Sequence, residues 1–379
     1  MQLEGDIEDR EFLMIPGPVT VEDEVLEALG RPVRAHYGDE WTRLYKHAVA
    51  GMKEVFKTSG DVHLVFGSGM AGVEMCIASV LAPGDEVLVA TNGLFGDRMA
   101  EVAAANRLQV HTIRPGLAEA LTAEHVRAAL AAHPAVRAVC VVHHETSIGV
   151  LNDVEGICRA AREHGALAIV DGISTVGGVP FDMDAWGADL CVTVANKCIG
   201  GPIGVAPVAA GPRALHALDD GRTKAAGWYL NLATWRRFAK EWGAWHPHPT
   251  TMPTNVVEAF DLALTRLLEE GVEHRCRRLA AARDRVREGL EEMGFEMLAP
   301  ITTASPVTTA AYGLPGMDVA DYMGFLLRDH RIRIGGGLGE LSGRIIRIGH
   351  MGRAAEPEAI DRYLRATADY VDQHGLSRA

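Results

Sequence analysis

The stretch Leu167 to Gly204 reads LAIVDGISTVGGVPFDMDAWGADLCVTVANKCIGGPIG and decides the fold of this chain. It contains two short apolar runs, and each ends at a polar residue. Asp171 follows the first run, while Asn196 and Lys197 follow the second. Apolar runs of this length between Gly and Pro residues are typical of buried strands in a parallel sheet. Because such a sheet places its chemistry at the carboxyl ends of its strands, we expect Asp171 and Lys197 to meet in one crevice.

A carboxylate and an amine at two strand ends have two interpretations. Charged side chains are costly to bury unless they are paired, so Asp171 and Lys197 could form a structural ion pair. Alternatively, they could hold pyridoxal phosphate (PLP). In that case the lysine amine forms a Schiff base with the cofactor aldehyde, and the carboxylate keeps the ring nitrogen protonated so that the ring can accept electrons. The rest of the chain decides between the two.

The composition excludes several classes of protein. The chain has 379 residues, 48% of them hydrophobic and 23% charged, which is typical of an ordinary globular protein. A net charge of −13 argues against binding to nucleic acid or to an anionic membrane surface. No apolar run approaches the ~20 residues that span a bilayer, and the acidic first residues do not resemble a signal peptide, so we expect a cytoplasmic protein. The six cysteines form no C-x-x-C pair and indicate neither a disulfide framework nor a zinc site.

Strand and helix patterns alternate from residue 62 onward and predict an α/β fold with a seven-stranded, mostly parallel sheet. The predicted strands are His63–Phe66, Glu86–Ala90, Gln109–Ile113, Ala138–Val142, Leu167–Val170, Leu190–Val194 and Val205–Ala209. Helical stretches such as Ala118–Ala132 and Val154–His164 lie between them. A long helical stretch at 255–293, broken near Gly271, leads into a smaller C-terminal α/β unit. We predict an N-terminal arm at 1–20, a large domain at 21–268 and a small domain at 269–379.

The glycine loop Gly67–Gly72, with the sequence GSGMAG, follows a predicted strand and opens a predicted helix. It matches the G-x-G-x-x-G pattern of dinucleotide-binding sites. Such a site also requires an acidic residue at the end of the next strand, and here that strand runs into Thr91-Asn92-Gly93. The loop still suits a single phosphate, because free N–H groups at a helix N-terminus attract an anion.

Two other strand ends carry side chains that suit the same pocket. Phe95 stands between glycines, where an aromatic ring could stack on a planar cofactor or could simply fill a buried loop. The run His143-His144-Glu145-Thr146 places polar groups where another strand stops. Neighbouring residues on a strand point to opposite faces, so we do not expect the two histidines to share a metal, and we predict none. Taken with the Asp–Lys pair, these features indicate a PLP pocket.

The chain resembles the fold-type I PLP enzymes, specifically the class V aminotransferases of the alanine–glyoxylate and serine–pyruvate branch. The resemblance extends over nearly the whole length. The motifs that carry it are Pro16-Gly17-Pro18, Gly67-Ser68-Gly69, Asn92-Gly93-Leu94-Phe95-Gly96-Asp97-Arg98, Glu145-Thr146-Ser147-Ile148-Gly149-Val150, Asp171, Asn196-Lys197 and Arg347-Ile348-Gly349.

The resemblance implies roles for the residues nearest the cofactor ring. Lys197 would form the Schiff base and move protons during catalysis. Asp171 would contact the pyridine nitrogen, Phe95 would stack on the ring, and Thr146 would lie near the ring hydroxyl. These roles make Lys197 and Asp171 the expected catalytic residues.

The resemblance also implies how the phosphate and the substrate are held. The residues implied to bind the phosphate within one chain are Ser68, Gly69, Met70 and Asn196. Thr251 would reach the phosphate of the neighbouring subunit, so we expect a homodimer with shared active sites. Arg347 would clamp the substrate carboxylate, and Gly17 and Tyr37 are further candidates for substrate contact.

A related branch, pyridoxamine–pyruvate transaminase, is similar around His143-His144 and Arg347-Ile348-Gly349. That branch carries an acid at the position of Ser68, a tyrosine at Phe95 and an arginine at Leu338, and all three are absent here. We therefore expect ordinary use of PLP in an aminotransferase. By resemblance alone, the amino group would pass from a small amino acid such as Ala or Ser to glyoxylate or pyruvate.

Three alternatives remain open. The chain could be a pyridoxamine–pyruvate transaminase, or it could be a PLP-dependent lyase on the same fold. Class V desulfurases, however, stack a histidine on the ring and use a loop cysteine, whereas this chain has Phe95 and no cysteine after Cys276. A non-enzymatic module that binds a dinucleotide through the glycine loop is the third alternative.

Overall fold

The computed structural model describes residues 11–220 and 227–376, and its larger sheet contains the strands that the sequence predicted. Within these residues the strand order is β2-β10-β9-β8-β5-β3-β4. Neighbouring strands pair in parallel, except that β10 runs antiparallel to both β2 and β9. The prediction of a seven-stranded, mostly parallel sheet is confirmed. The bounds are β2 Asp61–Phe66, β3 Glu86–Ala90, β4 Gln109–Ile113, β5 Val136–Val142, β8 Leu167–Asp171, β9 Leu190–Val192 and β10 Val205–Ala210.

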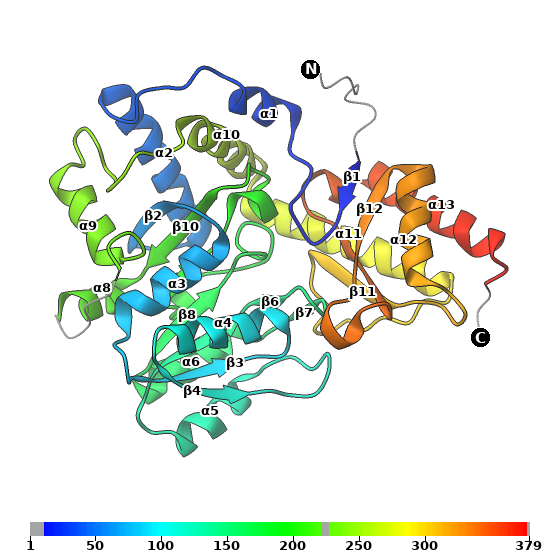
Figure 1. Ribbon diagram of the computed structural model, residues 1–379, viewed down its shortest axis with the longest axis horizontal. Helices are drawn as coiled ribbons and strands as arrows, with labels where there is room; N and C mark the ends of the chain where they lie inside the picture. Colours follow the sequence, from blue (N-terminus) through cyan, green and yellow to red (C-terminus); the bar gives the residue numbers. More distant parts are fainter. Residues whose placement is uncertain (1–10, 221–226, 377–379) are drawn as a thin grey trace.

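Helices cover both faces of this sheet because the chain reverses its direction of travel across it (Figure 1). The crossovers through α3 (Gly69–Val80) and α4 (Leu94–Ala105) move toward the β4 edge. Those through α5 (Ala123–Ala132), α6 (Val154–His164) and α7 (Met183–Trp186) move back toward β9. Since parallel crossovers are right-handed, opposite directions of travel place the two groups on opposite faces.

Two details of the predicted structure need correction. The helix expected from Ala118 begins at Ala123, because Thr122 forms a capping box with His125 and so fixes the start of α5. The segment around Phe95 is the first turn of α4 and not an irregular loop. Its glycines, Gly93 and Gly96, hid the helix from the sequence pattern.

The remaining elements of the larger unit surround the sheet. A hairpin of two-residue strands follows β5, and the other helices lie before β2 or after β10. None of the helices in the described part of the chain is long and apolar enough to cross a membrane. The bounds are β6 His144–Glu145, β7 Val150–Leu151, α1 Asp23–Leu29, α2 Asp39–Phe56, α8 Pro212–Asp219, α9 Leu232–Glu241 and α10 Thr254–Glu270.

A second sheet of four strands, in the order β1-β12-β13-β11 among the described residues, lies beside the first unit (Figure 1). The sequence did not predict β1, whose three residues pair in parallel with β12 and so place part of the N-terminal arm in this sheet. The predicted break at Gly271 separates α10 from α11. The domain bounds 20/21 and 268/269 stay predictions. The elements are β1 Phe12–Met14, β11 Thr308–Tyr312, β12 Ile332–Gly336, β13 Ile345–Gly349, α11 Val272–Glu292, α12 Val319–His330 and α13 Pro357–Gln373.

Candidate active site

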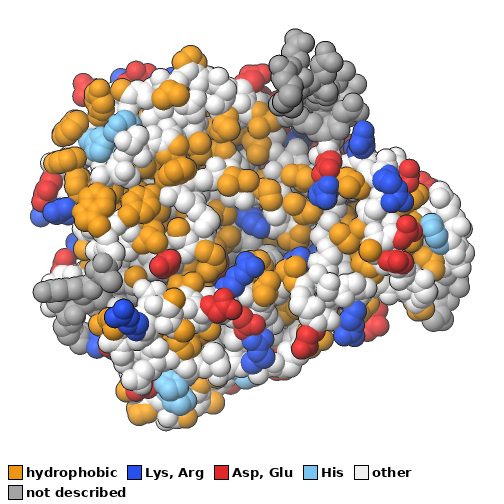
Figure 2. Space-filling view, viewed as in Figure 1, with side chains coloured by type: hydrophobic (Ala, Val, Ile, Leu, Met, Phe, Trp, Pro, Cys, Tyr) orange, Lys and Arg blue, Asp and Glu red, His pale blue; other side chains and the backbone are white. Residues whose placement is uncertain are grey.

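A cavity of about 220 Å³ lies at the carboxyl ends of β8 and β9. A hollow bordered mainly by hydrophobic side chains, with basic side chains inside it, is visible near the centre of the face in Figure 2. Most of the predicted site residues contribute to the cavity wall. The residues of that wall are Gly67, Ser68, Gly69, Met70, Phe95, Val142, His144, Thr146, Asp171, Ile173, Ser174, Val194, Asn196, Lys197, Ile203 and Gly204.

Lys197 enters the cavity from a short helical turn, Ala195–Ile199, that follows β9. Its backbone, with φ −119° and ψ −124°, lies outside the main allowed regions. Outliers of this kind persist where the surrounding structure enforces them, and they cluster at active sites. The amine Nζ donates a hydrogen bond to the carbonyl oxygen of Pro16 in the N-terminal arm.

Gly17 lies directly against Lys197 and does not line the cavity itself. Its φ of 103° is in the left-handed region that favours glycine. A Cβ atom built on Gly17 would also overlap the end of the Lys197 side chain. Glycine is therefore required at position 17 for two reasons, its backbone conformation and the lack of space for a side chain. The N-terminal arm thus holds the Lys197 amine in place.

Asp171, the last residue of β8, is only 4% exposed. Within the described residues, the one hydrogen bond to its carboxylate comes from Ile173 N, at 2.9 Å from Oδ1. Burial raises the pKa of Asp171 to about 7, because an apolar environment disfavours the charged form. Burial likewise lowers the pKa of Lys197 to about 8, while nearby Asp171 acts in the opposite direction. A carboxylate with free acceptor capacity and an amine that loses its proton easily thus share one cavity.

The N-terminus of α3 forms the anion-binding end of the cavity. Gly67 N donates to the carbonyl oxygen of Gly204 at 2.9 Å, which holds the glycine loop against the segment after Lys197. Ser68 is the N-cap residue, and its side chain makes no capping hydrogen bond; among the described residues no other side chain caps this helix. Ala71 N and Gly72 N donate to the carbonyl oxygen of Ser68, whereas Gly69 N and Met70 N have no acceptor among the described residues and are available to an anion. A Cβ on Gly69 would overlap the side chain of Ile173, so glycine is needed there for close packing.

At the N-terminus of α4, by contrast, a protein side chain accepts hydrogen bonds from the free backbone amides. The Glu145 carboxylate accepts hydrogen bonds from Phe95 N and Gly96 N, each at 3.0 Å, and from the amide and hydroxyl of Ser147. This arrangement fixes the position of the Phe95 ring at the cavity wall, and Thr146 follows Glu145 into the same wall. The sequence placed Glu145 among the polar groups of this strand end without giving it a role.

Arg347 lies behind the cavity wall on β13 and is 8% exposed. Its Nη1 donates to the carbonyl oxygen of Thr146 at 2.9 Å, and its Nε donates to that of Gly336 at 2.8 Å. Among the described residues no carboxylate forms a salt bridge with it, so its charge stays available to an anionic ligand. Arg344 is exposed and lies just before β13, whose five residues are all buried.

The structure does not bring Tyr37 and Thr251 into the cavity of their own chain. Tyr37 is 54% exposed and contacts the rings of His36 and Trp245. Thr251 is exposed in the segment between α9 and α10. Their expected contacts with substrate and with a neighbouring subunit stay predictions.

Among the cavity residues that were not predicted to have a role are His144, Ser174 and Ile203. Ser174 Oγ lies 3.1 Å from His144 Nδ1, so the two side chains form a polar pair in the wall. The available signal was position, because His144 and Ser174 both lie just beyond the carboxyl end of a large-sheet strand. Ile203 follows the glycine pair after Lys197 and gave no such signal.

The comparisons with known proteins agree with this geometry. Residues 22–354 match the family model described as Aminotransferase class-V. An uncharacterized aminotransferase of Methanocaldococcus jannaschii is 33% identical over 351 residues, covering 93% of this chain and 90% of that protein. Pyridoxamine–pyruvate transaminase of Mesorhizobium japonicum is 30% identical, with coverage of 92% and 88%.

Solved structures give the same result for the fold. The crystal structure of alanine–glyoxylate aminotransferase from Nostoc sp. superimposes with a TM-score of 0.92 at 31% identity, and the match covers 98% of each chain. The predicted fold-type I architecture is thereby confirmed. The chain belongs to the class V aminotransferases and is an aminotransferase enzyme of that family.

Proposed function

We propose that the cavity binds PLP and that the enzyme transfers an amino group from a small amino acid to a 2-oxo acid such as glyoxylate or pyruvate. The observation that carries this proposal is the shared position of Lys197 and Asp171. Both side chains line one cavity, and a helix N-terminus without a capping side chain opens into it. An amine, a carboxylate and an anion site are the three groups that PLP requires.

The residues present fit the cofactor. The free amides at the start of α3, with the Ser68 hydroxyl, would hold the phosphate, and Asn196 stands in the same wall. The carboxylate of Asp171 has unused acceptor capacity and would receive the N–H of the pyridine ring. Phe95 would cover the ring, and Thr146 would lie near its hydroxyl. When bound, PLP supplies an aldehyde for amines and a ring that withdraws electrons from the substrate Cα.

Each side chain then has a separate task. Lys197, whose pKa is lowered to about 8 by burial, would take the proton from the substrate Cα and so act as the general base, and in its protonated form as the general acid. Asp171 holds a proton at the ring nitrogen. Arg347 would bind the substrate carboxylate, because a guanidinium can form two parallel hydrogen bonds. Among the described residues no carboxylate forms a salt bridge with it, although the nearby Glu145 carboxylate favours its charged form.

The substrate pair is proposed from the relatives. The Nostoc enzyme is named alanine–glyoxylate aminotransferase and aligns over nearly the full length of this chain. The alternative is the reaction of the similar pyridoxamine–pyruvate transaminase, which would use an unphosphorylated substrate. Ser68 at the uncapped end of α3 favours the phosphorylated cofactor, because an acid there would repel a phosphate.

We further propose a cytoplasmic homodimer in which Thr251 reaches the partner's phosphate site. Tyr37, Trp228 and Trp245 are about half exposed, and aromatic side chains at a surface are typical of subunit interfaces. All six cysteines are free and buried, which suits a reducing compartment. Equilibrium sedimentation tests the dimer, and a mass equal to one chain would rule it out.

The assignment is tested by trapping and by a substrate screen. Borohydride reduction of the purified enzyme, followed by peptide mapping, should place a pyridoxyl group on Lys197, and Lys197→Ala should remain folded but inactive. An adduct on another lysine would overturn the assignment. A screen of amino donors against glyoxylate and pyruvate, with pyridoxamine as one donor, then separates the two proposed reactions.

A further inference from the structure

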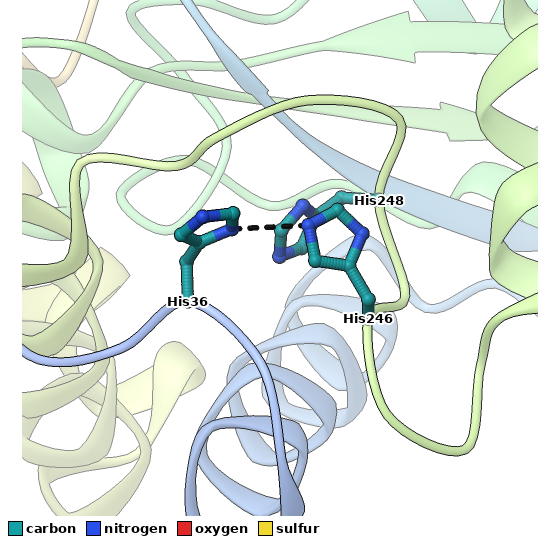
Figure 3. A group of neighbouring side chains, drawn as sticks. All are labelled: His36, His246 and His248. Carbon is teal, nitrogen blue, oxygen red and sulfur yellow. Dashed lines mark hydrogen bonds between the residues drawn. The ribbon is translucent and has the colours of Figure 1, made fainter.

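Three histidines from distant parts of the sequence lie together outside the active site (Figure 3). His36 belongs to the segment between α1 and α2, whereas His246 and His248 belong to the segment between α9 and α10. One nitrogen from each ring lies within 4.8 Å of the other two. His246 and His248 are buried and His36 is partly exposed. Burial favours the neutral imidazole, which is the form that binds a metal ion.

The planes of the three rings cross one another. The angle between the planes of His36 and His246 is 69°, that between His246 and His248 is 53°, and that between His36 and His248 is 36°. Each nitrogen lone pair lies in the plane of its own ring, so crossing planes allow three lone pairs to meet at one point. In Figure 3 the rings of His36 and His246 point toward each other, with His248 beside them.

The hydrogen bonds of the rings leave nitrogens that can serve as ligands. His248 Nδ1 lies 2.6 Å from the carbonyl oxygen of Thr250 and donates to it, which leaves the lone pair on Nε2. A metal-binding histidine commonly makes this contact through its second nitrogen. His36 Nδ1 lies 3.0 Å from His246 Nε2. The other nitrogen of His246 is buried without a partner in the described part of the chain, so the contact with His36 alone bears on its tautomer.

Two hydrogen bonds compete with a metal, namely the one between His36 and His246 and one from Trp41 to His248. Trp41 Nε1 donates a hydrogen bond to His248 Nε2 at 2.7 Å. Ligation through that nitrogen would replace this bond. The loss of these two hydrogen bonds is small beside the formation of three metal–nitrogen bonds, and the competition from Trp41 provides a specific test.

We propose that His36, His246 and His248 bind one divalent transition metal ion, with Zn²⁺ as the best match. Three imidazole ligands without a carboxylate favour zinc over magnesium or calcium. The fourth ligand position would be open to a water molecule, since His36 and its neighbour Tyr37 reach the surface. The ion would join two segments that are 210 residues apart at the His36–His246 contact, and it would order the segment that leads to Thr251.

A second cluster in the molecule provides a matched control. Glu86, His111 and His133 at the β3–β4 edge also bring three ligand atoms within 4.8 Å. There, however, the two imidazoles are stacked, with an angle of 22° between the planes and 3.7 Å between the ring centroids. The lone pairs of stacked rings run side by side and do not converge on one ion. We therefore assign the metal to the first cluster alone.

The test is a zinc titration of the full chain without a histidine tag, after treatment with a chelator. Isothermal titration calorimetry should show one ion per chain with a Kd at or below about 10 μM. His36→Ala should weaken binding at least ~30-fold, and His111→Ala should leave it within about 3-fold. Trp41→Phe removes the competing N–H group and should strengthen binding. Circular dichroism melting checks that each variant is folded.

Several results would overturn the proposal. These are no zinc binding by the wild type at 100-fold higher concentration, binding that His36→Ala leaves unchanged, or binding that is lost in His111→Ala. A Trp41→Phe protein that binds zinc no more tightly would remove His248 from the ligand set. If His36→Ala does not fold, His36→Gln provides the same comparison at this partly exposed position.

Discussion

Two buried carboxylates lie near the ends of the neighbouring strands β5 and β8: Glu145 just after β5, and Asp171 as the last residue of β8. They differ in the number of hydrogen bonds that their oxygens accept. Glu145 is 0% exposed and accepts four hydrogen bonds, from Phe95 N, Gly96 N and both donors of Ser147. Asp171 is 4% exposed and, among the described residues, accepts one, from Ile173 N. Burial raises the pKa of both groups.

The difference separates a structural group from a functional one. A buried carboxylate costs free energy that its hydrogen bonds offset, and Glu145 is fully supplied by its own protein. The Asp171 carboxylate accepts only one hydrogen bond from the described residues, so its remaining acceptor capacity is available to a ligand. The same contrast appears at two helix ends, because Glu145 caps α4 while no side chain caps α3. Substitutions should therefore affect activity at one site and stability at the other.

The largest expected effect is that of Asp171→Asn on turnover. The amide cannot hold a proton at the ring nitrogen as a carboxylate does, so kcat should fall by three to four orders of magnitude, about 4–5 kcal/mol. Cofactor affinity should fall much less. Stopped-flow kinetics and a cofactor titration measure the two quantities. Near-normal turnover in Asp171→Asn would remove Asp171 from the reaction.

The same variant has an opposite effect on the protein without cofactor. The folded-state pKa of Asp171, about 7, exceeds the usual 3.8, so the folded state holds this proton more tightly than the unfolded state. The stability linked to this group is complete below pH ~4 and is lost as the pH rises through 7. Asp171→Asn avoids that loss. Its free energy of unfolding relative to the wild type should therefore be higher at pH 8 than at pH 4, as denaturant titration would show.

Glu145→Ala should have the next largest effect, and the effect should be on stability. Removing the carboxylate leaves the amides of Phe95, Gly96 and Ser147 buried without acceptors. The free energy of unfolding should fall by about 3–4 kcal/mol, in the range for breaking a buried charged contact. Gly93→Ala is a second probe, because its Cβ would lie 2.5 Å from Glu145 Cγ and should also destabilise. Gly67→Ala, whose nearest contact is Ala71 Cβ at 3.1 Å, is the matched control.

These predictions depend on contacts that the sequence showed only in part. The strands at Glu86–Ala90 and Gln109–Ile113 were predicted with their observed bounds, because apolar runs between turn residues mark buried strands. Asp171 and Lys197 could be predicted together, since topology brings neighbouring strand ends to one crevice. The bonds to Glu145 could not, because three of its four donors are backbone amides, which carry no residue identity.

Other features were missed because they depend on long-range packing. The strand β1 has three residues and exists through its pairing with β12, more than 300 residues later. The contact of His36 with His246 joins segments that no local pattern connects. Tyr37 and Thr251 were predicted as site residues from resemblance, and a single chain places them away from the cavity.

The buried cation Arg347 can likewise be either functional, as Asp171 is, or structural, as Glu145 is. Its two protein contacts are carbonyl oxygens, which do not neutralise its charge. If it serves a ligand, as Asp171 does, Arg347→Ala should lower kcat/KM for the amino acid at least ~30-fold, about 2 kcal/mol, with little change in melting temperature. Arg347→Lys should restore little, because an ammonium group cannot form two parallel hydrogen bonds. A variant with a lower melting temperature but an unchanged kcat/KM for the amino acid would show that Arg347 has a structural role, as Glu145 does.

The smallest expected effect is that of a substitution that gives the uncapped N-terminus of α3 a capping carboxylate. Ser68→Asp places a carboxylate at the uncapped, exposed N-terminus of α3, where it should act as Glu145 does at α4. The helix should gain about 0.5–1 kcal/mol from its new cap. The affinity for PLP should fall at least ~10-fold, about 1.4 kcal/mol, because the carboxylate repels the phosphate.

Ser68→Asn is the matched control, since asparagine caps a helix equally well without a charge. Unphosphorylated pyridoxal should bind both variants alike. Equal losses of PLP affinity in the two variants would show that shape, and not charge, determines binding there, and that the open end of α3 is not an anion site.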